Sequence, residues 1–141
     1  MFKAPVQVPI PDDLIEGQAI HILFFLTDIN AQTLFKIDVV GRNDDIPLHI
    51  KCVSLQEEKY IALNTRVNGQ WGHEVHLFDK WDVKGFVTYA LTIGIGQKGF
   101  RIYIDDKHID DYEYRRLDSI TAVRILGDII VRETNPPISA E

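Results

Sequence analysis

The stretch from Ala62 to Val75, ALNTRVNGQWGHEV, places an amide, a guanidinium, an indole and a carboxylate around a tight Asn-Gly turn. If the flanking segments are strands, Asn64 and Arg66 project from one face of a sheet, because alternate residues of a strand share a face. Trp71 follows the turn, and Glu74 begins the return strand. A sugar offers an apolar C–H face that an indole can cover and hydroxyls that polar side chains can bond. The stretch therefore suggests a sugar-binding site.

Two further segments alternate in the same way. We expect Ile46 to Val53 to turn Ile46, Leu48, Ile50 and Cys52 inward and Pro47, His49, Lys51 and Val53 outward. Tyr60 to Val67 and Glu74 to Phe78 also alternate, which adds His76 to the outward set. If these strands are neighbours, one polar patch bordered by Trp71 results, made of His49, Lys51, Asn64, Arg66, Glu74 and His76.

The rest of the chain also predicts strands. Prolines at positions 5, 9 and 11 make Ala4 to Pro11 an edge strand, because proline cannot donate to a sheet ladder. Further strands are expected at Ala19–Thr27, Leu34–Val40, Phe86–Ile95, Phe100–Asp105, Lys107–Arg115, Thr121–Leu126 and Asp128–Glu133. Helical periodicity is absent, and Leu117 to Ile120 could hold one helical turn at most. The chain is predicted to be a single all-β domain, 1–141, an antiparallel sandwich or barrel.

Composition limits the function classes. The 141 residues carry a formal charge of -6, which argues against a nucleic-acid partner, since such binding depends on Lys and Arg neutralising phosphates. One cysteine excludes an internal disulfide. The N-terminus has no apolar run typical of a signal peptide, and the longest apolar run, Ile20 to Leu26, is too short for membrane insertion. We expect a soluble protein, cytoplasmic or extracellular without a signal peptide.

The order and spacing of His49, Asn64, Trp71, Gly72 and Glu74 resemble the sugar-binding signature of the galectins. Similarity continues through Phe78, Gly85, the strand FRIYIDD, Tyr112–Arg115 and the closing VRILGDIIV, so that it covers roughly Ala4 to Glu133. The resemblance implies the galectin fold, a concanavalin-like jelly-roll sandwich of two antiparallel sheets. It also implies β-galactoside binding on the concave face, and dimers through sheet edges are a possibility.

The resemblance assigns roles to four residues of the motif. His49 would bond the axial 4-hydroxyl of galactose, and Asn64 its 6-hydroxyl. Trp71 would stack on the apolar face of the ring, and Glu74 would bond the neighbouring sugar.

The chain departs from the family pattern at three positions. Where the family has His-x-Asn-x-Arg, this chain has Lys51 for the Asn and Val53 for the Arg, and His76 replaces a second Arg. Each lost charged hydrogen bond costs about 1.5–3 kcal/mol, and every ~1.4 kcal/mol is tenfold in affinity. We therefore expect weakened or altered β-galactoside binding, with Lys51 and Arg66 as replacement donors. The alternative is a galectin-like interaction or dimerisation module that has lost sugar binding.

Other interpretations of these residues are possible. Glu74 and Arg66 could pair across the hairpin instead of awaiting a ligand. Zinc binding by His49, His73 and His76 is disfavoured because His73 lies on the other face from His76. No pair among the carboxylates at 105–106 and 110–111 is spaced for glycosidase chemistry, so neither an enzyme nor a cofactor is expected. Cys52 is interpreted as a core residue, and the loop at Asp79–Asp82 is expected to expose Trp81 for packing or for a partner.

Overall fold

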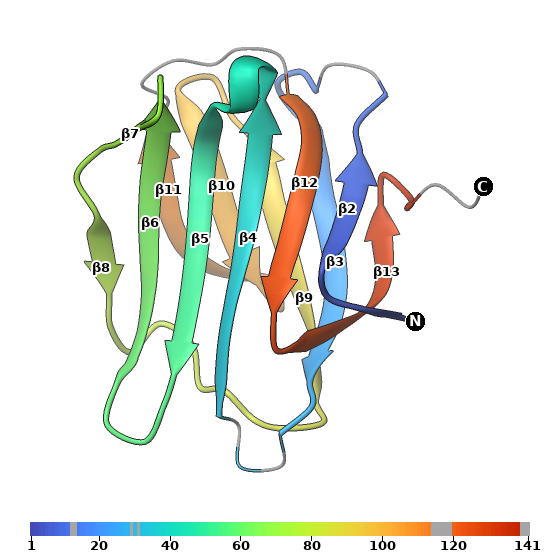
Figure 1. Cartoon of the computed structure of the whole chain (residues 1–141), viewed down its shortest axis with the longest axis vertical. Coiled ribbons are helices and arrows are strands. Elements are labelled where there is room, and N and C mark those ends of the chain that lie inside the picture. Colours follow the sequence, from blue (N-terminus) through green and yellow to red (C-terminus); the bar gives the residue numbers. More distant parts are fainter. Residues whose placement is uncertain (12–13, 29, 31, 114–119, 139–141) are drawn as a thin grey trace.

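Two antiparallel sheets pack face to face in the computed structural model (Figure 1), which describes residues 1–11, 14–28, 30, 32–113 and 120–138. One sheet has six strands in the order β1 (Phe2–Lys3), β13 (Ile129–Asn135), β3 (Ala19–Leu26), β9 (Thr88–Ile95), β10 (Gly99–Ile104) and β11 (Lys107–Glu113). Among the described residues, no helix is long and apolar enough to cross a bilayer.

The other sheet carries the polar segments identified in the sequence. Its order is β2 (Val6–Pro9), β12 (Ile120–Gly127), β4 (Thr33–Gly41), β5 (Ile46–Ser54), β6 (Lys59–Val67) and β7 (Gln70–Trp71), and β8 (Val75–Leu77) also pairs with β6. A short 3-10 turn, η1 (Arg42–Asp44), joins β4 to β5. The three alternating segments are therefore adjacent strands, as expected, and their outward side chains lie on one surface.

The core fills the space between the two sheets. Alternate residues of the longer strands are buried there, and the largest fully buried side chains include Phe24, Phe35, Phe100, Ile37 and Leu63. Burying one such side chain contributes about 1.5–3 kcal/mol, so this layer is the main source of stability. Cys52 lies in this core, as predicted. The predicted all-β, two-sheet sandwich is confirmed.

Most predicted strands are present with small changes at their ends. The proline-flanked segment forms β2 at a sheet edge, as expected, but the strand predicted from Phe86 begins at Thr88. Phe86 has a positive φ of 58° and is exposed, which takes it out of the ladder. β1 was not predicted.

Two predictions lie wholly or partly outside the described residues. They are the last two residues of the strand predicted at Lys107–Arg115 and the helical turn considered near position 117. The described chain resumes at Ile120, which begins β12.

The predicted orientation of Ile46 is wrong. The ladder between β5 and β6 shifts register between Ile46 and His49, and Ile46 pairs with Arg66. Such a bulge inserts an extra residue and reverses the alternation beyond it. Ile46 is therefore buried outside the central core cluster, on the outward face that Arg66 shares.

Trp81 packs against the core, which decides between the two roles considered for it. Its ring contacts the rings of Tyr89, Phe35 and Phe24 edge-on at centroid distances of 5.0, 5.8 and 6.1 Å. Edge-to-face contacts of this kind are favourable aromatic geometry. The 79–82 loop thus covers one end of the sandwich with its indole.

Candidate functional site

The hairpin between β6 and β7 presents Trp71. Val67 pairs with Gln70, and the two residues between them, Asn68 and Gly69, have positive φ angles of 53° and 77°. This is a two-residue type I′ turn, which Asn-Gly favours because both central residues must adopt positive φ. The tight turn predicted from the sequence is therefore present, and it places Trp71 directly opposite Arg66.

The indole of Trp71 forms an exposed platform beside a recessed imidazole. Trp71 is 47% exposed, and its ring lies 4.7 Å from the ring of His49, centroid to centroid. The guanidinium carbon of Arg66 lies 5.5 Å from the indole centroid, within the range of a cation–π interaction. Trp71 is thereby held at a fixed place on the sheet while much of its surface stays open to a ligand.

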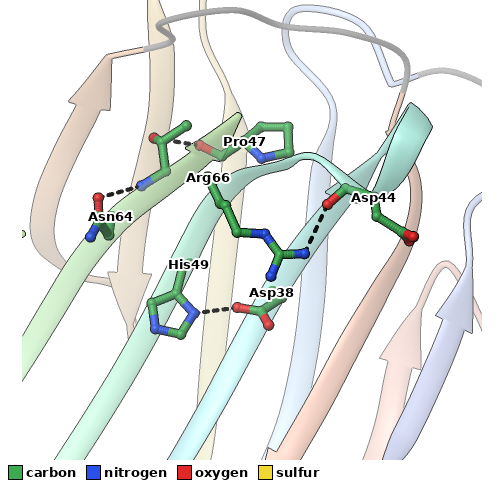
Figure 2. A network of polar contacts seen from close by, with 7 residues as sticks. Asp38, Asp44, Pro47, His49, Asn64 and Arg66 are labelled. Carbon is green, nitrogen blue, oxygen red and sulfur yellow. Dashed lines mark hydrogen bonds and ion pairs between the residues drawn. The ribbon is translucent and has the colours of Figure 1, made fainter. Parts of the chain in front are cut away.

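His49 pairs with a carboxylate on the neighbouring strand. Its Nδ1 lies 2.5 Å from Oδ1 of Asp38, and both side chains are about nine-tenths buried. The ladder places His49 opposite both Asp38 and Asn64, so the three residues form one row across β4, β5 and β6. A carboxylate can only accept, so Nδ1 carries the proton, and in a neutral ring this leaves Nε2 as the acceptor. Figure 2 shows this pair beside Arg66.

Asn64 is oriented by the backbone of the next residue, Thr65. Its side-chain oxygen accepts a hydrogen bond from the backbone N–H of Thr65 at 2.8 Å (Figure 2). The amide NH2 is left as the group that can donate to a ligand. Asn64 and His49 are only 5% and 8% exposed, so both polar groups lie at the bottom of the site instead of standing out in solvent.

Arg66 reaches across the sheet and does not pair with Glu74. Figure 2 shows its side chain extending from β6 toward Asp44, whose backbone oxygen accepts a hydrogen bond from Nη2 at 3.1 Å. Nε of Arg66 is buried without a hydrogen-bond partner, and leaving such a donor unpaired costs about 1–3 kcal/mol. Glu74 instead bonds His76 through Oε1 and Nε2. Arg66 therefore keeps one buried donor unpaired.

An aromatic cluster lies at the far end of the same face, around Val53 and His76. His76 stacks on Tyr60 with centroids 4.8 Å apart, and Phe78 lies 6.1 Å from both rings. Val53 pairs directly with Tyr60. Tyr60 and Val53 also line a cleft of about 370 Å³ that the loop at positions 79–83 closes on its other side. The same cleft is also lined by Lys59, Asp79, Lys80 and Asp82, so this end of the face combines aromatic rings with charged side chains.

The structure brings the predicted site residues onto one surface in two groups. His49, Asn64, Arg66 and Trp71 contact one another or pair across the ladder, whereas Lys51, Glu74 and His76 lie further along the same face. Sequence reasoning missed Asp38, because a pairing partner on another strand leaves no local pattern. It also missed Tyr60 and Phe78, although both lie on the outward face of segments whose alternation was recognised. The described residues contain no group of three or more side chains that could hold a metal.

Comparisons with known proteins agree with this geometry. A family model described as galactoside-binding lectin matches residues 5–135. The chain is 36% identical over 93 residues to a 32 kDa beta-galactoside-binding lectin of Haemonchus contortus and 33% identical over 93 residues to one of Caenorhabditis elegans. Each match covers 65% of this chain but 31% and 32% of the relatives, so the chain spans about a third of their length.

Solved structures resemble the fold over almost the whole chain. Sheep galectin-11, in a complex with glycerol, superposes with a TM-score of 0.76 at 18% identity, covering 92% of this chain and 95% of the other. The Caenorhabditis elegans galectin LEC-6 superposes with a TM-score of 0.78 at 21% identity, covering 95% and 91%. At these identities the likeness concerns the fold alone.

Proposed function

The chain belongs to the galactoside-binding lectin family, and from this premise we propose that it is a non-enzymatic lectin domain for galactose-containing glycans. Its binding surface is the outward face of the seven-stranded sheet, at the end where β6 turns into β7. Two of its relatives are themselves described as beta-galactoside-binding lectins, which supports the choice of ligand.

The observation that carries the proposal is the half-exposed indole of Trp71 beside the recessed His49 and Asn64. A sugar ring stacked on the indole removes apolar area from water at about 25 cal/mol per Å². Its hydroxyls then face two oriented groups, an acceptor at Nε2 of His49 and a donor at the amide of Asn64. The guanidinium of Arg66, whose carbon lies 5.5 Å from the indole centroid, is a further donor beside the platform.

The sugar attached to the stacked galactose would contact side chains that differ from those of the family motif. Val53 and His76 stand where the motif has arginines, and the carboxylate of Glu74 is already bonded to His76. Two uncompensated charged hydrogen bonds cost about 3–6 kcal/mol together, or about two to four powers of ten in affinity. The proposal is therefore a lectin with weakened affinity for ordinary β-galactosides and altered selectivity at the second sugar, where Tyr60 and Phe78 offer aromatic contact.

A glycan array with the wild-type protein and two variants tests the proposal. Trp71→Ala removes the proposed sugar platform, and Phe86→Ala is the control because it removes an exposed aromatic side chain outside the site. The expected result is binding to galactose-terminated glycans that Trp71→Ala abolishes and Phe86→Ala retains. No binding to any glycan by the folded protein at millimolar concentration would refute it.

A second candidate function is protein interaction or dimerisation without sugar. It is favoured by one observation, the exposed aromatic surface of Tyr60, His76 and Phe78, of which Phe78 is 59% exposed. Light scattering with the Phe78→Ala variant separates the two candidates. A dimer that Phe78→Ala dissociates, together with a Trp71→Ala variant that behaves like wild type in every assay, would favour the interaction module.

A further inference from the structure

The hairpin that carries Trp71 has an Asn-Gly pair at its tip. Asn68 is the only asparagine in the sequence that is followed by a glycine, and both residues of the pair are exposed. Beyond its chain neighbours, no heavy atom lies within 4 Å of the position where a side chain of Gly69 would begin. The main-chain nitrogen of Gly69 is therefore sterically accessible.

The side-chain amide of Asn68 is not engaged. Among the described residues it has no hydrogen-bond partner, and the backbone N–H of Gly69 has no acceptor. The turn is held from one side only, where the backbone N–H of Asn68 donates to Oδ1 of the buried Asp45 at 3.0 Å. The amide of Asn64, in contrast, is buried and accepts a hydrogen bond from the N–H of Thr65. The two reactive groups at the tip are thus unprotected.

An exposed asparagine amide before glycine can react with the main chain. The nitrogen of Gly69 attacks Cγ of Asn68, the Cγ–Nδ2 bond breaks, and the proton lost by Gly69 leaves with the departing ammonia. The product is a five-membered succinimide ring, and its closure requires the turn to open, which loop tips do at low free-energy cost. Water then opens the ring at either carbonyl, so that residue 68 becomes aspartate or isoaspartate. The reaction consumes only water and releases only ammonia.

Isoaspartate is incompatible with the turn that places Trp71. Two residues with positive φ join Val67 to Gln70 in the type I′ geometry. Isoaspartate routes the main chain through its side-chain carbonyl and adds one carbon to this short connection. Because loop length fixes the register of a hairpin, the pairing of Trp71 with Arg66 cannot persist. The indole then leaves its place beside the recessed groups of the sugar site.

We propose that Asn68 is a site of spontaneous deamidation, and that its conversion to isoaspartate displaces Trp71 and weakens sugar binding. This inference rests on the proposed function and adds a regulation of that same site by the age of the protein. Aspartate, the other product, keeps the length of the main chain and suits the same turn, since Asp-Gly also favours type I′. Loss of binding therefore follows the isoaspartate content and not the added charge.

Ageing the folded protein in warm, mildly alkaline buffer tests the proposal. Peptide mass mapping detects the exchange of the side-chain NH2 of Asn68 for OH, and methyl transfer by an isoaspartyl methyltransferase measures the isoaspartate formed. Lactose titration is carried out on the same samples. Protein fractionated for isoaspartate at position 68 should bind lactose at least about tenfold more weakly than fresh protein, because the indole no longer covers the sugar.

Asn68→Gly is the matched variant. It removes the reactive amide and keeps a residue that adopts positive φ freely, so that Gly-Gly forms the same turn. Fresh Asn68→Gly should bind lactose like wild type and should keep its affinity during ageing. Fresh Asn68→Asp carries the charge of the product on a main chain of normal length. Its lactose affinity should stay within about fivefold of wild type, as expected for one exposed charge.

Three outcomes overturn the inference. If urea-unfolded protein forms isoaspartate at position 68 and aged folded protein does not, the turn protects Asn68. Isoaspartate that leaves lactose affinity unchanged refutes the link to Trp71. An equal loss of affinity in aged Asn68→Gly assigns the loss to another cause. Fresh protein that binds no sugar refutes the proposed function instead, and the mass map then still decides whether Asn68 is modified.

Discussion

Nδ1 of His49 lies 2.5 Å from Oδ1 of Asp38, and this bond joins two neighbouring strands beneath the candidate sugar site. Because the carboxylate must accept, it fixes the tautomer of the ring and leaves Nε2 as an acceptor. Asp38, which fixes the orientation and tautomer of the His49 ring, therefore lies eleven positions away in the sequence and outside the motif.

Asp38→Ala should weaken glycan binding about tenfold, because His49 loses the partner that orients it. It should also lower the free energy of unfolding by about 1–3 kcal/mol, since a buried Nδ1 is left unpaired. Titration with lactose and urea unfolding measure the two effects. The matched control is Asp111→Ala, whose partner His108 is exposed and whose loss should cost under about 1 kcal/mol. Equal effects of both variants would contradict the role given to Asp38.

Aryl β-galactosides should bind more tightly than lactose. Their aromatic aglycone can pack on Tyr60 and Phe78, whereas the glucose of lactose meets Val53 where the motif provides an arginine. An aromatic pair contributes about 0.5–1.5 kcal/mol, which is about two- to tenfold in affinity. Competition titration with 4-nitrophenyl β-galactoside measures this, and Phe78→Ala should remove the advantage while Phe86→Ala keeps it. A preference that is independent of Phe78 would show that the aglycone lies elsewhere.

The two tryptophans should differ in their effect on stability. Trp81 contacts Phe24, Phe35 and Tyr89, so Trp81→Ala should lower the free energy of unfolding by about 3 kcal/mol. Trp71 is 47% exposed, and Trp71→Ala should cost about 1 kcal/mol or less. Urea unfolding followed by circular dichroism gives both values. A larger loss for Trp71 than for Trp81 would be inconsistent with the assignment of one indole to the core and the other to a ligand.

Cys52 should not react with thiol reagents while the protein is folded. Burial raises the pKa of its thiol far above the ordinary value, and the thiolate is the reactive form. Because the folded pKa is the higher one, the thiol favours the folded state below its unfolded pKa, and stability falls as the pH rises above that value. A thiol reagent at pH 8 should label Cys52 at a rate that increases with urea in step with unfolding. Fast labelling without denaturant would place the thiol at the surface.

The fold was predictable from the sequence because its strands alternate. Residues such as Ile61 and Leu63 repeat at every second position, and burial on one face produces that period directly. The orientation of Ile46 was not predictable, because a bulge changes the face without changing the apolar pattern around it.

The site was predictable only where its residues are close in sequence. Asn64 and Trp71 belong to one hairpin, and the Asn-Gly turn signals their arrangement. Asp38 comes from β4, whose pattern predicts a strand but not its partner. Pairing between distant strands is a property of the whole sheet, so the bond from His49 to Asp38 is seen only in the folded chain.

The central claim is that Trp71 is the platform of a sugar site, and its indole N–H resonance tests this most directly. Nitrogen–proton correlation spectra during titration with lactose should show a saturable shift of the Trp71 indole, with a dissociation constant on the order of 1 mM or about 4 kcal/mol. The Trp81 indole, packed against the core, should stay in place. Glucose, which differs from galactose at the 4-hydroxyl, should shift neither. A Trp71 resonance that no galactoside moves at tens of millimolar, or that glucose moves equally, would contradict the account.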